Sequence, residues 1–119
     1  MGLLNLSQGV SINTSLVGLA RTTSTGGNVH FFDGTQHAIQ GREDAAKVEA
    51  ALEDYAGYAV TEYGESVRFL INPQVVTRLQ DDSAARVLKL QIYGVTNALV
   101  VPGTFAEKVR GQISAAIGA

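Results

Sequence analysis

Short runs of hydrophobic residues separated by polar turns dominate the pattern of the chain. Leu88, Leu90 and Ile92 alternate with polar or amphipathic neighbours, and this period of two residues predicts a strand with one buried face. Further strand runs occupy residues 3–7, 10–13, 58–63, 66–71 and 95–101. Apolar residues recur every three or four positions over 42–55 and 104–117, which predicts two amphipathic helices. The pattern therefore predicts an α+β fold.

Glycine marks the turns of two hairpins. Asp33-Gly34, within NVHFFDGTQHAI, is a strong signal for a two-residue turn between paired strands. Gly94 stands between the strand that contains Ile92 and the run that follows it. We expect both turns to project from the edge of a sheet.

Asparagine interrupts a strand run at two places. Asn13 breaks SINTSLVGL, and Asn72 followed by Pro73 breaks FLINPQVVTRL. Asparagine can bond its own backbone, while proline fixes φ and donates no hydrogen bond, so we predict a structural bend at each place. Beyond each resumed strand, the polar stretches 22–27 and 80–85 are expected to be loops.

Each predicted helix carries signals at its first turn. Glu43 and Asp44 lie where the helix dipole favours negative charge. Thr104 and Glu107 have the spacing of a capping box, just after a strand that ends at Pro102. Both helices should cover a sheet with their apolar faces.

The order of these signals occurs twice. A strand, a second strand bent at an asparagine, a polar loop, a hairpin and a helix follow one another in residues 1–57 and again in residues 58–119. Aligned at a spacing of 59 to 61 residues, Asn13 meets Asn72 and Gly34 meets Gly94. We predict two tandem pseudo-symmetric repeats, each of about four short antiparallel strands followed by one helix. Because a unit this small is marginal alone, the repeats should pack as one domain with pseudo-twofold symmetry.

Composition adds limits to this prediction. The chain has 119 residues, enough for a single domain with one modest core. Only 17% of the residues are charged, so part of the surface is expected to lie against partners. The net charge of −2 opposes broad attraction to phosphate backbones. There is no cysteine and no apolar run of membrane-spanning length, so neither disulfides nor membrane insertion is expected.

Each half resembles the small flagellar FlbD-like proteins. The residues that carry the resemblance are SINTSLVGL with HFFDGTQHAI in the first half, and FLINPQVVTRL with LQIYGVTNALVV in the second. The tandem arrangement, the absence of a second Asp-Gly turn at Tyr93-Gly94 and the low charge depart from that family. No FlbD-like regulatory role is therefore carried over to this chain.

The whole chain also resembles small virion proteins of tailed phages, such as capsid decoration or cement proteins. The resemblance lies in size, in uncharged polar content and in turns rich in Gly, Thr and Asn. It implies a structural protein that binds copies of itself and a larger assembly such as a capsid. It places the chain in a virion if it is phage-encoded, and otherwise the default location is cytoplasmic.

Two histidines near the first hairpin turn are the one candidate metal site. A two-residue turn at Asp33-Gly34 would place His30 opposite His37, and Asp33 would supply a third ligand. A zinc site normally needs four protein ligands, or three and a water. Polar pairing across the strands is the favoured interpretation, and neither a metal nor a cofactor is expected.

Acidic residues do not assemble a predicted catalytic site. Glu43, Asp44, Glu49, Glu53 and Asp54 have helical spacing, and we expect most of them to face solvent. Asp81-Asp82 fits a polar turn better than a calcium loop. No nucleotide-binding or hydrolase motif occurs, so enzymatic activity is not expected.

A nucleic-acid interface is the alternative. Its candidate residues are Arg21, Arg78, Arg86, Lys89, Lys108 and Arg110, with Tyr58, Tyr63 and Tyr93 available for base stacking. The overall charge balance opposes it. The sequence favours a non-enzymatic assembly protein, and a small regulatory or nucleic-acid-binding protein stays the alternative.

Overall fold

The structure is a computed structural model that describes residues 3–118. Ten strands occur in these residues: β1 (Leu3–Asn5), β2 (Ser11–Asn13), β3 (Val17–Thr23), β4 (Gly26–Phe31), β5 (Gln36–Gln40), β6 (Ala56–Glu62), β7 (Glu65–Ile71), β8 (Val76–Asp82), β9 (Val87–Ile92) and β10 (Leu99–Pro102). The helices are α1 (Gly41–Ala51) and α2 (Gly103–Ile117), and three short 3₁₀ turns are η1 (Ser7–Gly9), η2 (Thr14–Leu16) and η3 (Pro73–Val75). The α+β class is confirmed.

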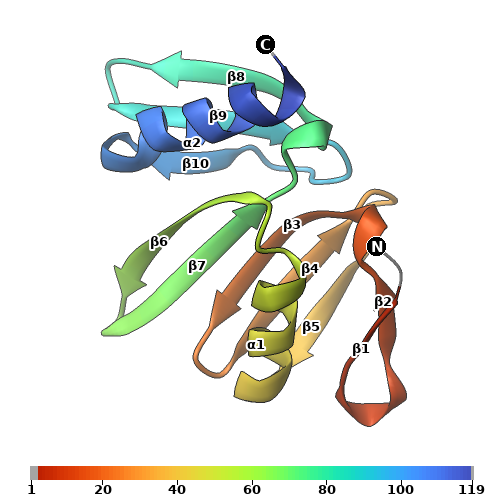
Figure 1. The fold of residues 1–119 in the computed structure, drawn as a ribbon. Coiled ribbons are helices and arrows are strands. Elements are labelled where there is room, and N and C mark those ends of the chain that lie inside the picture. The colour runs from red at the N-terminus through yellow and green to blue at the C-terminus, as the bar shows by residue number, and fades with distance from the viewer. Residues whose placement is uncertain (1–2, 119) are drawn as a thin grey trace.

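Three antiparallel sheets organise the strands. The largest has the order β5-β4-β3-β7-β6, the second β10-β9-β8, and β1 pairs with β2 alone. Helix α1 packs on β3, β4 and β5, and α2 packs on β9, β10 and β6 (Figure 1). The five-stranded sheet joins the two halves of the chain because β7 pairs with β3.

The hydrophobic interior consists of two clusters, so the prediction of one core is wrong. The first gathers residues from Leu6 to Leu52 and includes Leu70 from the second half. The second gathers residues from Ala56 to Ile113 and includes Leu19 from the first half. Each half thus has its own hydrophobic cluster under its own helix. Leu19 of β3 lies in the second cluster, and Leu70 of β7 lies in the first.

Two predicted loops are partly strand. β3 continues to Thr23 and β4 begins at Gly26, so only two residues of the stretch 22–27 form the turn. β8 likewise continues to Asp82. Thr22 is fully buried and its hydroxyl donates to Glu49 Oε2 at 2.6 Å, which shows why a polar residue lies within the sheet.

The first hairpin has a longer turn than predicted. Val29 lies opposite His37 and His30 opposite Gln36, so the two histidines are not paired across the strands. The cause is Gly34, whose φ of +89° adds a third residue to the loop, as in a type I turn followed by a glycine bulge. The His30 and His37 side chains therefore project from opposite faces of the sheet.

The helices match their apolar patterns but not their predicted caps. Ala45 and Val48 of α1 are buried, and the helix ends at Ala51 instead of continuing to residue 55. Pro102 occupies the N-cap of α2 and no side chain caps that helix, so the capping box predicted from Thr104 is wrong. Proline at this position ends β10 and starts the helix without a side-chain acceptor.

Candidate interaction site

The two predicted bends place the same turn before β3 and before β8. The Asn13 side chain caps η2, where its Oδ1 accepts from the Ser15 amide at 3.0 Å. The Asn72 side chain caps η3 and accepts from the Gln74 amide at 3.0 Å, with Pro73 as the first residue of that turn. Each bend redirects the chain from a hairpin into the next strand.

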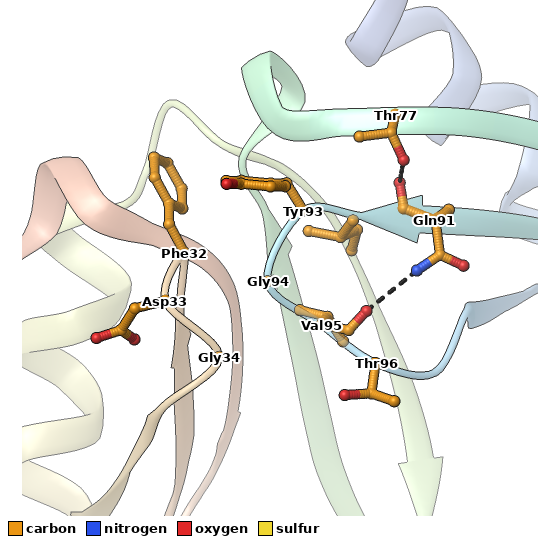
Figure 2. A pocket seen from close by; sticks show the side chains of 10 residues that line it. Phe32, Asp33, Gly34, Thr77, Gln91, Tyr93, Gly94, Val95 and Thr96 are labelled. Atoms are coloured by element: carbon orange, nitrogen blue, oxygen red, sulfur yellow. Dashed lines mark hydrogen bonds between the residues drawn. The ribbon is translucent and has the colours of Figure 1, made fainter.

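The two predicted hairpin turns meet at the boundary between the sheets. A Cβ at Gly94 would lie 2.6 Å from the carbonyl oxygens of Phe31 and Phe32, so the backbones approach closely there. Its φ of +86° also favours glycine. The Phe32 and Tyr93 rings lie 6.1 Å apart at an interplanar angle of 59°, and Figure 2 shows them on facing sides of the gap.

A cleft of about 450 Å³ lies between these turns. Asp33, Gly34 and Gly94, all singled out from the sequence, line it. A second cleft of about 440 Å³ adjoins it and shares Phe32, Asp33 and Tyr93, and adds Leu16. Tyr93 is 60% exposed and Leu16 47% exposed, so an apolar surface faces solvent at this place. We call Leu16, Phe32 and Tyr93 the junction patch.

The electrostatics of the cleft are simple. Among the described residues, Asp33 is the one charged residue that lines either cleft. The Thr35 hydroxyl and amide donate to its Oδ1 at 2.6 and 2.9 Å, and these hydrogen bonds hold the pKa of Asp33 below its usual value. Figure 2 shows its carboxylate directed away from Tyr93.

The polar side chains of the cleft are engaged with the backbone around them. The Thr77 hydroxyl donates to the Gln91 carbonyl at 3.2 Å, and Gln91 Nε2 donates to the Val95 carbonyl at 3.1 Å (Figure 2). These contacts fix the shape of the wall and pair no nucleophile with a base. The arrangement offers shape and apolar contact to a ligand instead of proton transfer.

The histidines do not form the metal site considered from the sequence. Their side chains project from opposite faces of the hairpin, as the register requires. Burial lowers the pKa of His30, which favours its neutral form near pH 7. Within residues 3–118, no three His, Cys, Asp or Glu side chains gather as metal ligands.

One acidic residue of α1 is buried, in contrast to the expected solvated face. Asp44 accepts from the Ser7 hydroxyl at 2.7 Å and from the Ser7 amide at 3.1 Å. The Ser7 hydroxyl is the main reason that the pKa of Asp44 lies below its usual value. Asp44 thereby anchors the β1–β2 hairpin to α1, and Lys47 Nζ adds a bond to the Asn5 carbonyl at 3.4 Å.

The candidate cations of a nucleic-acid interface are partly neutralised by neighbours. Arg21 pairs with Glu62 at 3.4 Å, Lys89 with Asp82 at 3.4 Å, and Arg110 with Asp81 at 2.8 Å. Tyr58 is buried against Phe69 and Phe105, so its ring is not available to a base. Burial raises the pKa of Tyr58 to about 12, with Glu62 adding to the effect.

Comparison with known proteins gives no family for the chain: no family model, curated protein or solved structure matches it. No helix in the described part of the chain has the length and apolarity needed to cross a bilayer. The site is therefore interpreted from its own geometry.

Sequence reasoning found the turns but not the junction patch. The signal for Phe32 and Tyr93 was present, because an aromatic residue stands two positions before the turn glycine in the first half and one position before it in the second. Their proximity depends on how the two sheets meet, which no local pattern encodes. Leu16 lies in the stretch SINTSLVGL, for which the sequence predicted only a bend at Asn13 and a resumed strand.

Proposed function

We propose that the chain is a non-enzymatic structural protein that binds a larger protein assembly, and that its specific role is that of a capsid decoration or cement protein. The junction patch carries this proposal. It exposes Leu16 and Tyr93 around a cleft whose one charged side chain is directed away. Apolar and aromatic surface with few charges is the composition of the centre of a protein interface.

The proposed tandem duplication fits the same role. Hairpin, capped 3₁₀ turn, three strands and helix occur in the order β1-β2-η2-β3-β4-β5-α1 and then β6-β7-η3-β8-β9-β10-α2. Paired contacts recur as well, because the Phe32 amide donates to the Leu16 carbonyl and the Tyr93 amide to the Val75 carbonyl, both at 2.9 Å. Repeated units that use edges to join one another are a simple route to larger assemblies.

The joint between the proposed repeats is one-sided. β7 of the second unit pairs with β3 of the first, whereas β2 of the first unit pairs only with β1 among the described strands. A twofold joint would use both pairs. A head-to-tail relation between the units therefore fits better than the pseudo-twofold symmetry expected from the sequence.

A paired substitution tests the proposed role. Virus particles from the source of the chain are sedimented with wild-type protein, with Tyr93→Ser and with Tyr63→Ser. Tyr63 is fully exposed at the β6–β7 turn, outside both clefts, and serves as the matched control. We expect wild type and Tyr63→Ser to cosediment and Tyr93→Ser to bind at least about tenfold more weakly. Absence of wild-type binding to the particles would reject the decoration role.

The alternative role is tested by retention on nucleic acid at low salt. A nucleic-acid-binding protein should be retained on DNA or RNA and released as salt rises. The ion pairs of Arg21, Lys89 and Arg110 oppose such binding, and we expect no retention. Salt-dependent retention together with failure to bind particles would favour the nucleic-acid-binding role over the assembly role.

A further inference from the structure

We propose that the β1–β2 hairpin of one copy pairs along the free edge of β8 in a second copy, so that the chain associates with itself head to tail. This inference rests on the proposed assembly role and identifies the partner surface. The interaction is strand addition, in which backbone hydrogen bonds supply much of the affinity.

Both edges required for this pairing are open. β8 has β9 as its one strand neighbour, and β2 has β1, among residues 3–118. Figure 1 shows β8 and the β1–β2 hairpin at opposite ends of the molecule, so one copy does not join its own two edges. Open strand edges are templates for pairing with another chain.

The chain contains the same joint internally. β7 pairs antiparallel with β3, with Ala20 opposite Leu70 and Arg21 opposite Phe69. β8 follows η3 as β3 follows η2, and β2 precedes the Asn13 bend as β7 precedes the Asn72 bend. A hairpin added from a second copy would complete the order β10-β9-β8-β2-β1, which matches the order β5-β4-β3-β7-β6.

Asn72 shows what the internal joint does to the bend. It is 8% exposed, its Nδ2 donates to the Val17 carbonyl at 3.1 Å, and its amide donates to the Gly18 carbonyl at 2.9 Å. The bend is thus covered by β3. In the proposed joint between two copies, Asn13 of one copy takes the place of Asn72 and lies against the carbonyls of Val76 and Thr77 in the other.

Exposure differs between the two bends and the two strands in the way that this joint requires. Asn13 is exposed, although its local cap is the same as that of Asn72. Val17 and Ala20 of β3 are fully buried, whereas Val76 and Leu79, their counterparts in β8, are only half-buried. The surface left open on β8 is the surface that β7 covers on β3.

The joint between two copies should be weaker than the internal joint between β3 and β7. Thr77 and Arg78 stand in β8 where Gly18 and Leu19 stand in β3, and both are exposed. A Cβ at Gly18 would lie 3.3 Å from Ile92 and from the Tyr93 carbonyl, so Thr77 needs a slightly wider approach. We therefore expect the association to be reversible, and because the hairpin of one copy binds the edge of the next, we expect it to extend into chains.

An engineered disulfide tests the pairing and its register. By the internal register, Val10 of one copy lies opposite Gln80 of the next, as Phe69 lies opposite Arg21. Directly opposed antiparallel residues are close enough for a disulfide, and the natural chain has no cysteine. The variant Val10→Cys with Gln80→Cys should give a ladder of dimers, trimers and larger species on a non-reducing gel after mild oxidation.

Two controls show whether the cross-linked species depend on the proposed register and on both cysteines in one chain. Ser11→Cys with Gln80→Cys moves the cysteine to the opposite strand face, and we expect at least about tenfold less cross-linking. A mixture of the Val10→Cys and Gln80→Cys single variants should stop at the mixed dimer. No ladder from the matched pair, or an equal ladder from the shifted pair, would overturn the proposed joint.

A second measurement needs no substitution, so it still tests the joint if the cysteine variants fail to fold. In the unmodified chain, amides of β8 and β2 should exchange at least about tenfold more slowly at high protein concentration than at low, while those of the β10 edge should not change. Unchanged exchange in β8 would overturn the joint. Particle binding without a ladder would remove this joint and leave the assembly role, whereas a ladder without particle binding would do the reverse.

Discussion

At the scale of single residues, two asparagines in the same local turn have different surroundings. Asn13 and Asn72 each cap a 3₁₀ turn through Oδ1. Asn72 alone is buried and bonded across to the Val17 carbonyl. The sequence predicted the bend at both positions because asparagine favours such turns, but the cross-strand bond of Asn72 depends on β3, which lies far away in the chain.

Asn72→Ala should therefore destabilise the protein more than Asn13→Ala. Loss of a cap costs about 1 kcal/mol, and loss of the buried hydrogen bond to the Val17 carbonyl, which keeps the Tyr55 hydroxyl as a donor, adds about 1 kcal/mol. We expect a loss of about 2 kcal/mol for Asn72→Ala and about 1 kcal/mol for Asn13→Ala in dilute solution, measured by urea denaturation. Equal losses would contradict the cross-strand role of Asn72.

Asp44 makes the attachment of the β1–β2 hairpin dependent on pH. Hydrogen bonds from Ser7 lower its pKa in the folded chain. A lowered pKa means that Asp44 stabilises the fold above its unfolded pKa of about 3.9 and that this contribution is lost as pH falls through the folded value.

Asp44→Asn should accordingly make the free energy of unfolding less dependent on pH under acidic conditions. Between about pH 5 and pH 2, the wild type should lose more stability than the variant, whereas above about pH 5 their difference should be constant. Denaturation midpoints across this range measure the effect. Parallel profiles would contradict it, because Asp33 and Asp82, whose pKa values are also lowered, are present in both proteins.

At the scale of elements, the strength of local patterns decided what the sequence predicted correctly. The alternation of Leu88, Leu90 and Ile92 predicted β9, and all three are buried. The helices were found from their apolar period. The histidine register was wrong by one residue, because loop length depends on the conformation of Gly34 and a sequence pair does not specify it.

The pairing of β3 with β7, which joins the two halves in one sheet, could not be predicted from the sequence. β3 and β7 pair at a separation of about 50 residues, and neither strand carries a signal for its partner. The two hydrophobic clusters follow from that pairing, because Leu19 and Leu70 project from neighbouring strands to opposite interiors. The candidate site was predicted in its turns and missed in its aromatic surface for the same reason.

Gly94→Ala tests the close approach of the two turns. Its Cβ would lie 2.6 Å from two backbone carbonyl oxygens, whereas a Cβ at Gly64, at a similar φ of +75°, would meet nothing within 4 Å. We expect a loss of about 1 kcal/mol for Gly64→Ala from strain alone and at least about 3 kcal/mol for Gly94→Ala. Similar losses in thermal denaturation would contradict the contact between the turns.

At the scale of the whole molecule, the five-stranded sheet couples the two cores. Leu70 is buried in the first cluster although it belongs to the second half. Leu70→Ala should lower the free energy of unfolding by about 3 kcal/mol and keep one cooperative transition, followed by circular dichroism and by tyrosine fluorescence. Two separate transitions in the wild type would show that the halves fold independently.

The open edges of β8 and β2 allow the proposed head-to-tail joint to link whole molecules. Sedimentation equilibrium of the unmodified chain over a wide concentration range measures this association. With this joint, the mass should rise from the monomer value of 12.5 kDa through the dimer to larger multiples as concentration increases. A mass that stays at the monomer value, or stops at the dimer, up to about millimolar protein would contradict it.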